Sequence, residues 1–259
     1  MTRLKLACAF ALSIVSGPVT AQDMLRNVDL ASPMMTLADF SRADVEAMVM
    51  AAAGKPLDLA GRSLNGLDLS GLDLSGANLR AARLNKAKLA GTKLDGAILD
   101  QVWALEADLS GASMRGAQLF GTQLQGATLD GADMTGARLA GDFSRASFRK
   151  AILAGADLSP DMKNQSMGLM RAVLKSARLD GADLKGANFS RTNLEFAHFD
   201  GADFSGALLV EAEAAGADFR AAKLDGANLT GIDLNSARID AAALPLLAKA
   251  ENVKKAFVD

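Results

Sequence analysis

The residue types that most often catalyse reactions are scarce in this sequence. The chain of 259 residues has one histidine, His198, and one cysteine, Cys8. A Ser-His-Asp or Cys-His mechanism needs a base that packing holds beside a nucleophile, whereas His198 occupies an outward position of a repeated pattern. Aspartates recur singly, without a second histidine or a thiolate to complete a metal site. The sequence therefore predicts no catalytic residue, no metal and no cofactor.

A bulky apolar residue recurs at every fifth position over most of the chain. The series begins at Leu59, continues through Leu139 and, after two irregular steps, reaches Leu244. A small residue, usually alanine, lies two positions before each bulky one. Side chains two apart on an extended backbone point to the same side. Both therefore face an interior, and the polar residue between them points outward.

Five-residue spacing fits neither a long helix nor a long strand, so each unit must be a short extended piece followed by a corner. Glycine usually lies two residues after the bulky position, where a tight turn with positive φ disfavours residues with a Cβ. Such units wind into coils that stack through backbone hydrogen bonds about 4.8 Å apart. We expect the bulky and small residues to fill the axis of a solenoid.

The stretches ADLSGASMRGAQL, ANLRAARLNKAKL and ADFSGALL resemble the A(D/N)LXX signature of the pentapeptide repeat family. The resemblance implies an all-β solenoid, a right-handed quadrilateral β-helix with four repeats per coil. At four repeats per coil, the repeats present would make about nine coils, which stack at the spacing of neighbouring strands.

The first residues predict a signal peptide. Arg3 and Lys5 form a basic region, an apolar run ends at Val15, and small residues lead to Ala21. The apolar run is too short to span a bilayer. We expect cleavage after Ala21, a periplasmic or secreted protein, and no membrane insertion. Cleavage removes Cys8, which leaves a chain without disulfides.

The ends of a solenoid expose unpaired backbone groups and apolar side chains, so they need caps. Ser41 and Asp44 form a capping-box pattern before RADVEAMVMAAA, and Pro245 precedes LLAKAENVKKAFVD. Both stretches predict short α-helical caps. The C-terminal helix could instead join two chains as a homodimer, as in some members of the family.

The predicted parts are the signal peptide 1–21, an N-terminal segment with a helix 22–56, repeats 57–158, an irregular stretch 159–168, repeats 169–244 and a C-terminal helix 245–259.

Two steps depart from the five-residue spacing. The step from Leu139 to Phe143 is one residue short, and the step from Leu158 to Leu169 is one residue longer than two repeats. Residues 159–168, SPDMKNQSMG, fill the longer step. They form either a projecting loop or an irregular half-coil.

In the half-coil interpretation Met162 and Met167 replace leucine. We favour the loop because Pro160 and Asn164 are turn residues, and because Lys163 would otherwise approach the axis. In the family a loop that interrupts the rod can be a recognition element. Pro160, Lys163 and Asn164 are therefore candidate partner-binding residues.

A second candidate surface consists of apolar residues at or near outward positions. Ile98 and Trp103 stand where polar residues are usual, and Leu105 and Phe120 follow bulky positions nearby. Glutamines surround them, which is the composition of a protein-binding site with an apolar centre and a polar rim. Alternatively, Trp103 packs over Ala104, which stands where leucine is expected.

The formal net charge is −2, and basic residues alternate with acidic ones, which predicts no nucleic-acid-binding surface. We predict a non-catalytic exported scaffold that binds an unidentified partner protein through a flat face or an end. One alternative is a DNA mimic that protects a topoisomerase, as cytosolic members of the family do. Another is an enzyme acting on envelope glycans, which would need clustered carboxylates in a cleft.

Overall fold

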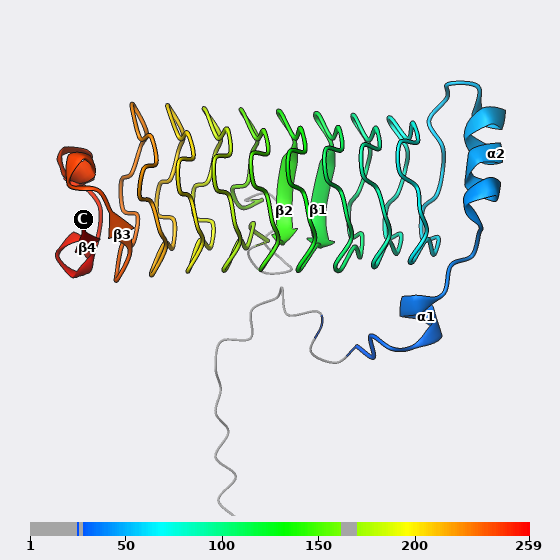
Figure 1. Cartoon of the computed structure of the whole chain (residues 1–259), viewed down its shortest axis with the longest axis horizontal. Coiled ribbons are helices and arrows are strands. Elements are labelled where there is room, and N and C mark those ends of the chain that lie inside the picture. Colours follow the sequence, from blue (N-terminus) through cyan, green and yellow to red (C-terminus); the bar gives the residue numbers. More distant parts are fainter. Residues whose placement is uncertain (1–24, 26–27, 162–169) are drawn as a thin grey trace, which may run out of the picture.

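The computed structural model describes residue 25, residues 28–161 and residues 170–259. The predicted signal peptide 1–21 lies outside the described residues, as do Lys163 and Asn164. Figure 1 shows the described chain as a regular rod, with helix α2 (Arg42–Ala52) across one end and the C-terminus at the other. No helix among the described residues is both long and apolar enough to cross a bilayer.

Parallel pairing between successive coils builds the rod. Asp68 pairs with Lys88, and Lys88 pairs with Asp108, so one regular coil contains twenty residues. Four five-residue repeats therefore give each coil four sides. The amide of Leu69 donates to the carbonyl oxygen of Lys88 at 2.7 Å, and bonds of this kind recur along the rod. They satisfy the backbone groups that a buried, non-helical chain would otherwise leave without partners.

The interior contains the residues that the five-residue spacing predicts. Leucines and alanines of the repeats are almost completely buried. In the C-terminal half, phenylalanines replace several leucines, and their rings pack together. The rings of Phe199 and Phe219, one coil apart, stack with centroids 4.9 Å apart and an interplanar angle of 16°. Because no repeat buries its side chains alone, stability accumulates from coil to coil.

The aspartate of the repeat closes the corner that follows it. Asp73 Oδ1 accepts hydrogen bonds from the amide of Ser75 at 3.1 Å and from its hydroxyl at 2.7 Å. Asp203 binds Ser205 in the same way. These hydrogen bonds, the hydroxyl first, hold the pKa of both carboxyls below the usual range. Asp and Asn are thus favoured at this position because they bind the backbone of the turn.

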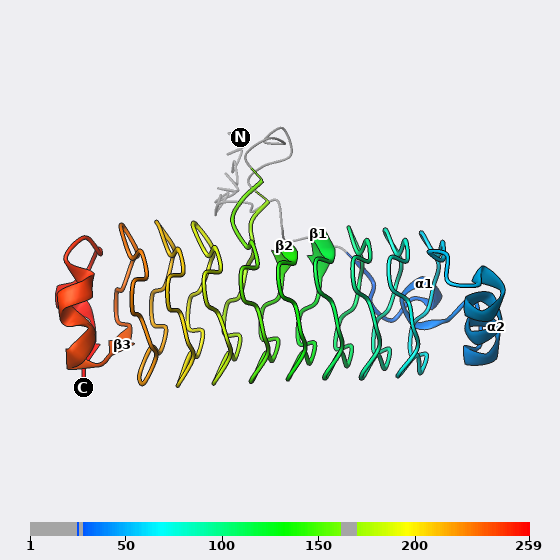
Figure 2. The same cartoon turned by 90° about the horizontal axis from the view of Figure 1, so that it is seen from above.

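Helix α2 begins where the sequence predicts. Ser41 and Asp44 form the reciprocal capping box, with the Ser41 amide donating to Asp44 Oδ2 at 2.8 Å. Val45 is fully buried against the first coil. Arg42 donates to Asp68 Oδ1 at 3.2 Å. Figures 1 and 2 both show α2 lying across the end of the rod.

The prediction of one α-helix over 245–259 is wrong. The chain forms the 3₁₀ helices η2 (Ala241–Leu247) and η3 (Val253–Lys255), followed by strand β4 (Phe257–Val258). Asn252 has φ 55°, a left-handed conformation that interrupts helical geometry. Strand β4 pairs in parallel with β3 (Arg238–Ile239), because the last coil still offers free backbone groups to the chain end.

We expect the protein to lose stability below about pH 4, the range in which carboxyls of the unfolded chain take up protons. Asp73 and Asp203 have lowered pKa values in the folded state, so their stabilising effect is present above the unfolded pKa and is lost as the pH falls. Replacing both by asparagine keeps the acceptor and removes the titrating group. The thermal midpoint of this variant, followed by circular dichroism, should fall less on acidification than that of the parent. An equal fall in both proteins would contradict this role.

Candidate functional site

The segment that precedes α2 covers one side of the rod. We call residues 28–39, which include helix α1 (Pro33–Thr36), the strap. We call the side that they cover the strap face. The amide of Asp39 donates to Ser63 O at 2.7 Å, and the amide of Ser63 returns a hydrogen bond to Asp39 Oδ2 at 2.7 Å. The interior row of the strap face consists of Leu64, Leu84, Ala104 and Leu124.

Two asparagines twenty residues apart hold the strap. Asn65 Nδ2 lies 3.3 Å from the carbonyl oxygen of Met34. Asn85 Nδ2 donates to Met35 O at 3.3 Å, and Asn85 Oδ1 accepts from the amide of Leu105 at 3.0 Å. Buried amides with satisfied hydrogen bonds fix one arrangement of strap and coil. Sequence reasoning missed this contact, although the equivalent positions of the two asparagines were a usable signal.

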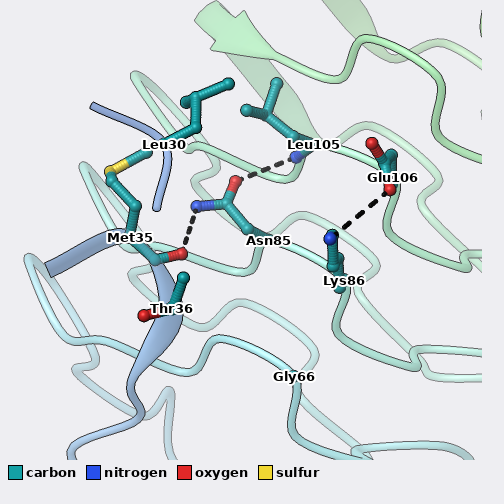
Figure 3. Close-up of a pocket in the computed structure, with 8 residues that line it drawn as sticks. All are labelled: Leu30, Met35, Thr36, Gly66, Asn85, Lys86, Leu105 and Glu106. Carbon is teal, nitrogen blue, oxygen red and sulfur yellow. Dashed lines mark hydrogen bonds and ion pairs between the residues drawn. The ribbon is translucent and has the colours of Figure 1, made fainter. Parts of the chain in front are cut away.

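The strap and the strap face enclose a pocket of about 190 Å³. Figure 3 shows Leu30, Met35 and Leu105 around it, with the side chain of Asn85 between strap and coil. At its rim Lys86 Nζ lies 3.8 Å from Glu106 Oε2. The pocket contains a single carboxylate, which is paired, so its chemistry suits apolar contact rather than acid–base catalysis.

The predicted apolar patch extends over two sides of the rod. Trp103 and Leu105 lie on the strap face, Ile98 and Phe120 lie on the neighbouring side, and all four are half-buried. Trp103 remains in the ladder, paired with Arg83 in one direction and with Gln123 in the other. The coil is therefore continuous at Trp103, even though the adjacent interior residue is alanine.

Both irregular steps occur at the edge between these two sides. The short step lies in strand β2 (Arg138–Asp142), which pairs in parallel with β1 (Gln118–Gln123). Their register shifts by one residue between Phe120 and Thr122. A Cβ on Gly141 would lie 2.5 Å from Thr122 O. Glycine is therefore required where the shortened corner packs on the coil beneath it.

The following coil contains the long step. Asp142 pairs with Val173, thirty-one positions later, which is eleven more than in a regular coil. The four sides of this coil are already filled by Phe143, Phe148, Leu153 and Leu158. No side remains for a half-coil, so the register requires an excursion from the edge. The ladder resumes around Val173, later than the predicted 169.

Arginines hold both flanks of the excursion. Arg138 Nη1 donates to Ser159 O at 2.7 Å. Arg171 binds both carboxylate oxygens of Glu213 at 2.7 Å, a bidentate geometry that fixes the guanidinium. Figure 2 shows the described flanks projecting from the rod. Pro160 is buried at the base, where it supports the flank rather than offering a contact surface.

The apolar patch and the excursion form one surface. The methyl carbon of Met170 lies 3.5 Å from the position that a Cβ on Gly121 would take, and Gln101 Cγ lies equally near. Gly121 directly follows Phe120 in β1. Two candidate sites that are far apart in the sequence therefore meet at one edge. We call Gln101, Trp103, Phe120, Met170 and Arg171 the edge surface.

Histidine and carboxylates do not assemble into a reactive site in the described part of the chain. His198 is exposed, in a ladder row between Arg178 and Asp218. No group of three His, Cys, Asp or Glu side chains among these residues is placed to hold a metal ion.

A profile described as pentapeptide repeats matches residues 63–101, 106–136, 169–206 and 215–244, in eight copies. These ranges make up more than half of the sequence. The chain belongs to the pentapeptide repeat family. Proteins of this family fold as right-handed quadrilateral β-helices, which agrees with the four-sided coils. They are generally non-catalytic scaffolds.

Solved structures of other pentapeptide repeat proteins are similar to this one. Full-length QnrB1, a plasmid-mediated fluoroquinolone resistance protein, is 16% identical, with 79% of this chain and 92% of QnrB1 covered and a TM-score of 0.56. HetL, involved in heterocyst differentiation regulation in the cyanobacterium Nostoc sp. strain PCC 7120, is 30% identical, with coverages of 76% and 96% and a TM-score of 0.28. The likeness to QnrB1 shows the fold alone. Comparison with curated proteins gives no significant match.

We expect the excursion of this pentapeptide repeat protein to be dispensable for folding. Deleting residues 160–170 joins Ser159 to Arg171 and leaves LSRAVL, in which Leu158 and Leu174 are five residues apart. The variant should keep the β spectrum and a thermal midpoint close to that of the parent, because the backbone ladder stays paired. A control that deletes residues 161–171 removes the same length together with the Arg171 anchor, and should be less stable. A large loss of stability in the variant that lacks residues 160–170 would contradict the assignment of these residues to an excursion outside the paired coils.

Proposed function

We propose that this protein is an exported, non-catalytic scaffold that binds a partner protein through the edge surface. The observation that supports the proposal is the approach of Met170, at the base of the excursion, to the corner formed by Gly121 and Gln101. Phe120 and Trp103 neighbour this corner in the sequence. Aromatic side chains flanked by amides and a fixed arginine have the composition of energetically important interface residues.

The rod makes this edge a preorganised surface. Arg138 and Arg171 fix the flanks of the excursion, and the paired coils fix Trp103 and Phe120. A partner that buries the two half-exposed rings therefore orders few side chains, which lowers the entropic cost of association. Arg171 and Glu213 at the periphery offer polar contacts that favour a particular orientation of the partner.

Export is the second part of the proposal. It is supported by the basic and apolar regions of residues 1–21 and by the small residues that end at Ala21. The processed chain would then act in the periplasm or outside the cell, and its partner would be an envelope or extracellular protein.

The ends of the rod complete the proposal. We take α2 as the cap of a rod of about nine coils, since Val45 seals its first coil. The other end exposes Leu244, Leu246, Phe257 and Val258, and β4 has no described strand beyond it. An unpaired edge strand with apolar side chains favours association with a second copy.

A DNA-mimicking role fits the surface less well. Acidic side chains are paired with basic ones on neighbouring coils, for example Glu195 with Lys175 at 2.7 Å and Glu211 with Arg191 at 2.7 Å. A mimic of duplex DNA needs a continuous anionic surface. Resistance to fluoroquinolones is stated for QnrB1, and sequence identity this low does not carry it to the present chain.

The edge surface can be tested with a double variant, Trp103→Ser and Phe120→Ser. The variant should lose at least about tenfold in affinity for proteins that the parent captures from an envelope extract, because central aromatic contacts dominate interface energies. The matched control is Ile152→Ser, which removes an exposed apolar side chain on a different side. Captured proteins are identified by mass spectrometry, and their affinities are measured by surface plasmon resonance. Equal capture by the double variant and the control would contradict the assignment.

Export can be tested by the mass of the expressed protein. The chain recovered from the periplasm should begin at Gln22, and a variant with Ala21→Pro should keep its N-terminal segment, because proline blocks cleavage at a small-residue site. Full-length protein confined to the cytoplasm would contradict export.

Association can be tested by sedimentation of the processed protein. We expect a concentration-dependent dimer, and a monomer when Phe257→Ser and Leu246→Ser are combined, since both residues are exposed at the C-terminal end. A dimer that survives these changes would place the contact elsewhere.

A further inference from the structure

The small pocket between the strap and the strap face shares no residue with the edge surface. Its volume is about 190 Å³, and an apolar cavity of about 150 Å³ can hold one benzene ring. Leu30, Met35 and Leu105 contribute apolar side chains to its wall. Met35 is only 4% exposed, and a thioether makes favourable contacts with aromatic rings. The pocket therefore has room for one ring or one branched aliphatic chain.

The polar side chains of the pocket wall are already paired. Asn85 Nδ2 donates to Met35 O at 3.3 Å, and Asn85 Oδ1 accepts from the amide of Leu105 at 3.0 Å. Thr36 Oγ1 donates to Ser32 O at 3.0 Å. Because these atoms have partners, an apolar group can enter the pocket without leaving a buried polar atom unpaired.

The rim of the pocket carries one positive and one negative charge. Lys86 Nζ lies 3.8 Å from Glu106 Oε2, and the two side chains are 72% and 68% exposed. Figure 3 shows both side chains beside the pocket. An exposed ion pair of this kind contributes little to stability. Both charged groups are therefore available to a ligand that enters from solvent.

The two rim residues occupy corners of the coil at which a Cβ is unfavourable. Gly66 and Gly126, in the same row of corners, have φ of 67° and 69°, and Lys86 and Glu106 have φ of 56° each. Several other corners of the rod also have a residue with a Cβ, but at this rim two successive coils place opposite charges beside a pocket. Backbone strain of this kind is often found at ligand-binding sites.

We infer that the pocket binds a free α-amino acid with a large apolar side chain. The side chain enters between strap and coil, the α-carboxylate lies at Lys86, and the α-ammonium lies at Glu106. Both charges of such a ligand are attached to one carbon atom, so their close spacing is complementary to that of the rim pair. A ligand with a single charge is attracted by one rim group and repelled by the other. The site needs no partner protein.

Methyl NMR tests this site with L-phenylalanine as the probe. In protein with isotope-labelled methionine methyl groups, the Met35 signal, assigned with Met35→Leu, should shift as phenylalanine is added, because the ring lies close to the thioether. The signal of Met134, which is fully buried in the core, should not move. The titration gives the affinity. A Met35 signal that stays in place up to the solubility limit of phenylalanine would overturn the inference.

Analogues of phenylalanine separate the two charges of the ligand in the unchanged protein. Phenethylamine lacks the carboxylate, 3-phenylpropionate lacks the ammonium, and N-acetyl-phenylalaninamide lacks both charges. Each should bind at least about threefold more weakly than phenylalanine, which is the effect expected of an exposed ion pair. N-acetyl-phenylalaninamide resembles a phenylalanine within a protein chain. If it bound as tightly as phenylalanine, the occupant would be a side chain of a partner protein, and the inference would be wrong.

Substitutions at the rim give the complementary test. Lys86→Gln should weaken phenylalanine about threefold without weakening phenethylamine, and Glu106→Gln should weaken phenylalanine about threefold without weakening 3-phenylpropionate. The matched control is Lys93→Gln, because Lys93 Nζ lies 3.5 Å from Asp73 Oδ2 in a similar pair on another side of the rod. The control should bind phenylalanine as the parent does. Equal affinity for phenylalanine in all three variants, with the fold confirmed by circular dichroism, would contradict the inference. The proposed partner-binding function is unaffected by this outcome, since no partner is present.

Discussion

The rest of the structure depends on the hydrogen bonds that join each residue to the residue one coil away. Because the amide of Leu69 must meet the carbonyl of Lys88, and so on along the rod, every coil has to return the chain to the same place. This requirement puts one bulky residue per repeat on the axis and a turn at each corner. It also orders the outward residues in rows, so residues twenty apart in the sequence become neighbours. The strap uses this order when it binds Asn65 and Asn85 in succession.

The same constraint explains why the irregular steps share one edge. A residue missing between Leu139 and Phe143 can be absorbed only where β2 tightens against β1, with Gly141 on Thr122. The insertion in the next coil leaves and returns at that edge, since any other path would break the pairing of Asp142 with Val173. The departures from regularity therefore accumulate at one place on the surface. Residues at this edge do not follow the five-residue repeat, so their side chains can form a binding contact that the regular faces of a solenoid do not offer.

The five-residue spacing predicted the interior, and the capping pair Ser41 and Asp44 predicted the start of α2, because both are local signals. The four-sided coil was implied by the resemblance to the pentapeptide repeat family rather than by the spacing itself. The C-terminal helix was predicted wrongly, since apolar spacing after Pro245 did not reveal that the last coil would pair with β4. The five-residue spacing alone could not decide between a loop and a half-coil, because it does not show which side of the coil each repeat occupies. The contact of Met170 with Gly121 joins positions far apart in the sequence and depends on those sides.

The central claim is that the apolar patch and the excursion form one edge surface, and cross-linking of introduced cysteines tests it most directly. The only natural cysteine is Cys8, so the processed chain offers a clean background. With Gln101→Cys and Met170→Cys, a short bismaleimide should form an intramolecular cross-link in the folded protein. Gln101→Cys with Ile152→Cys, which lies on another side, should not form one. Failure of the first pair to cross-link while the fold is intact would contradict the account.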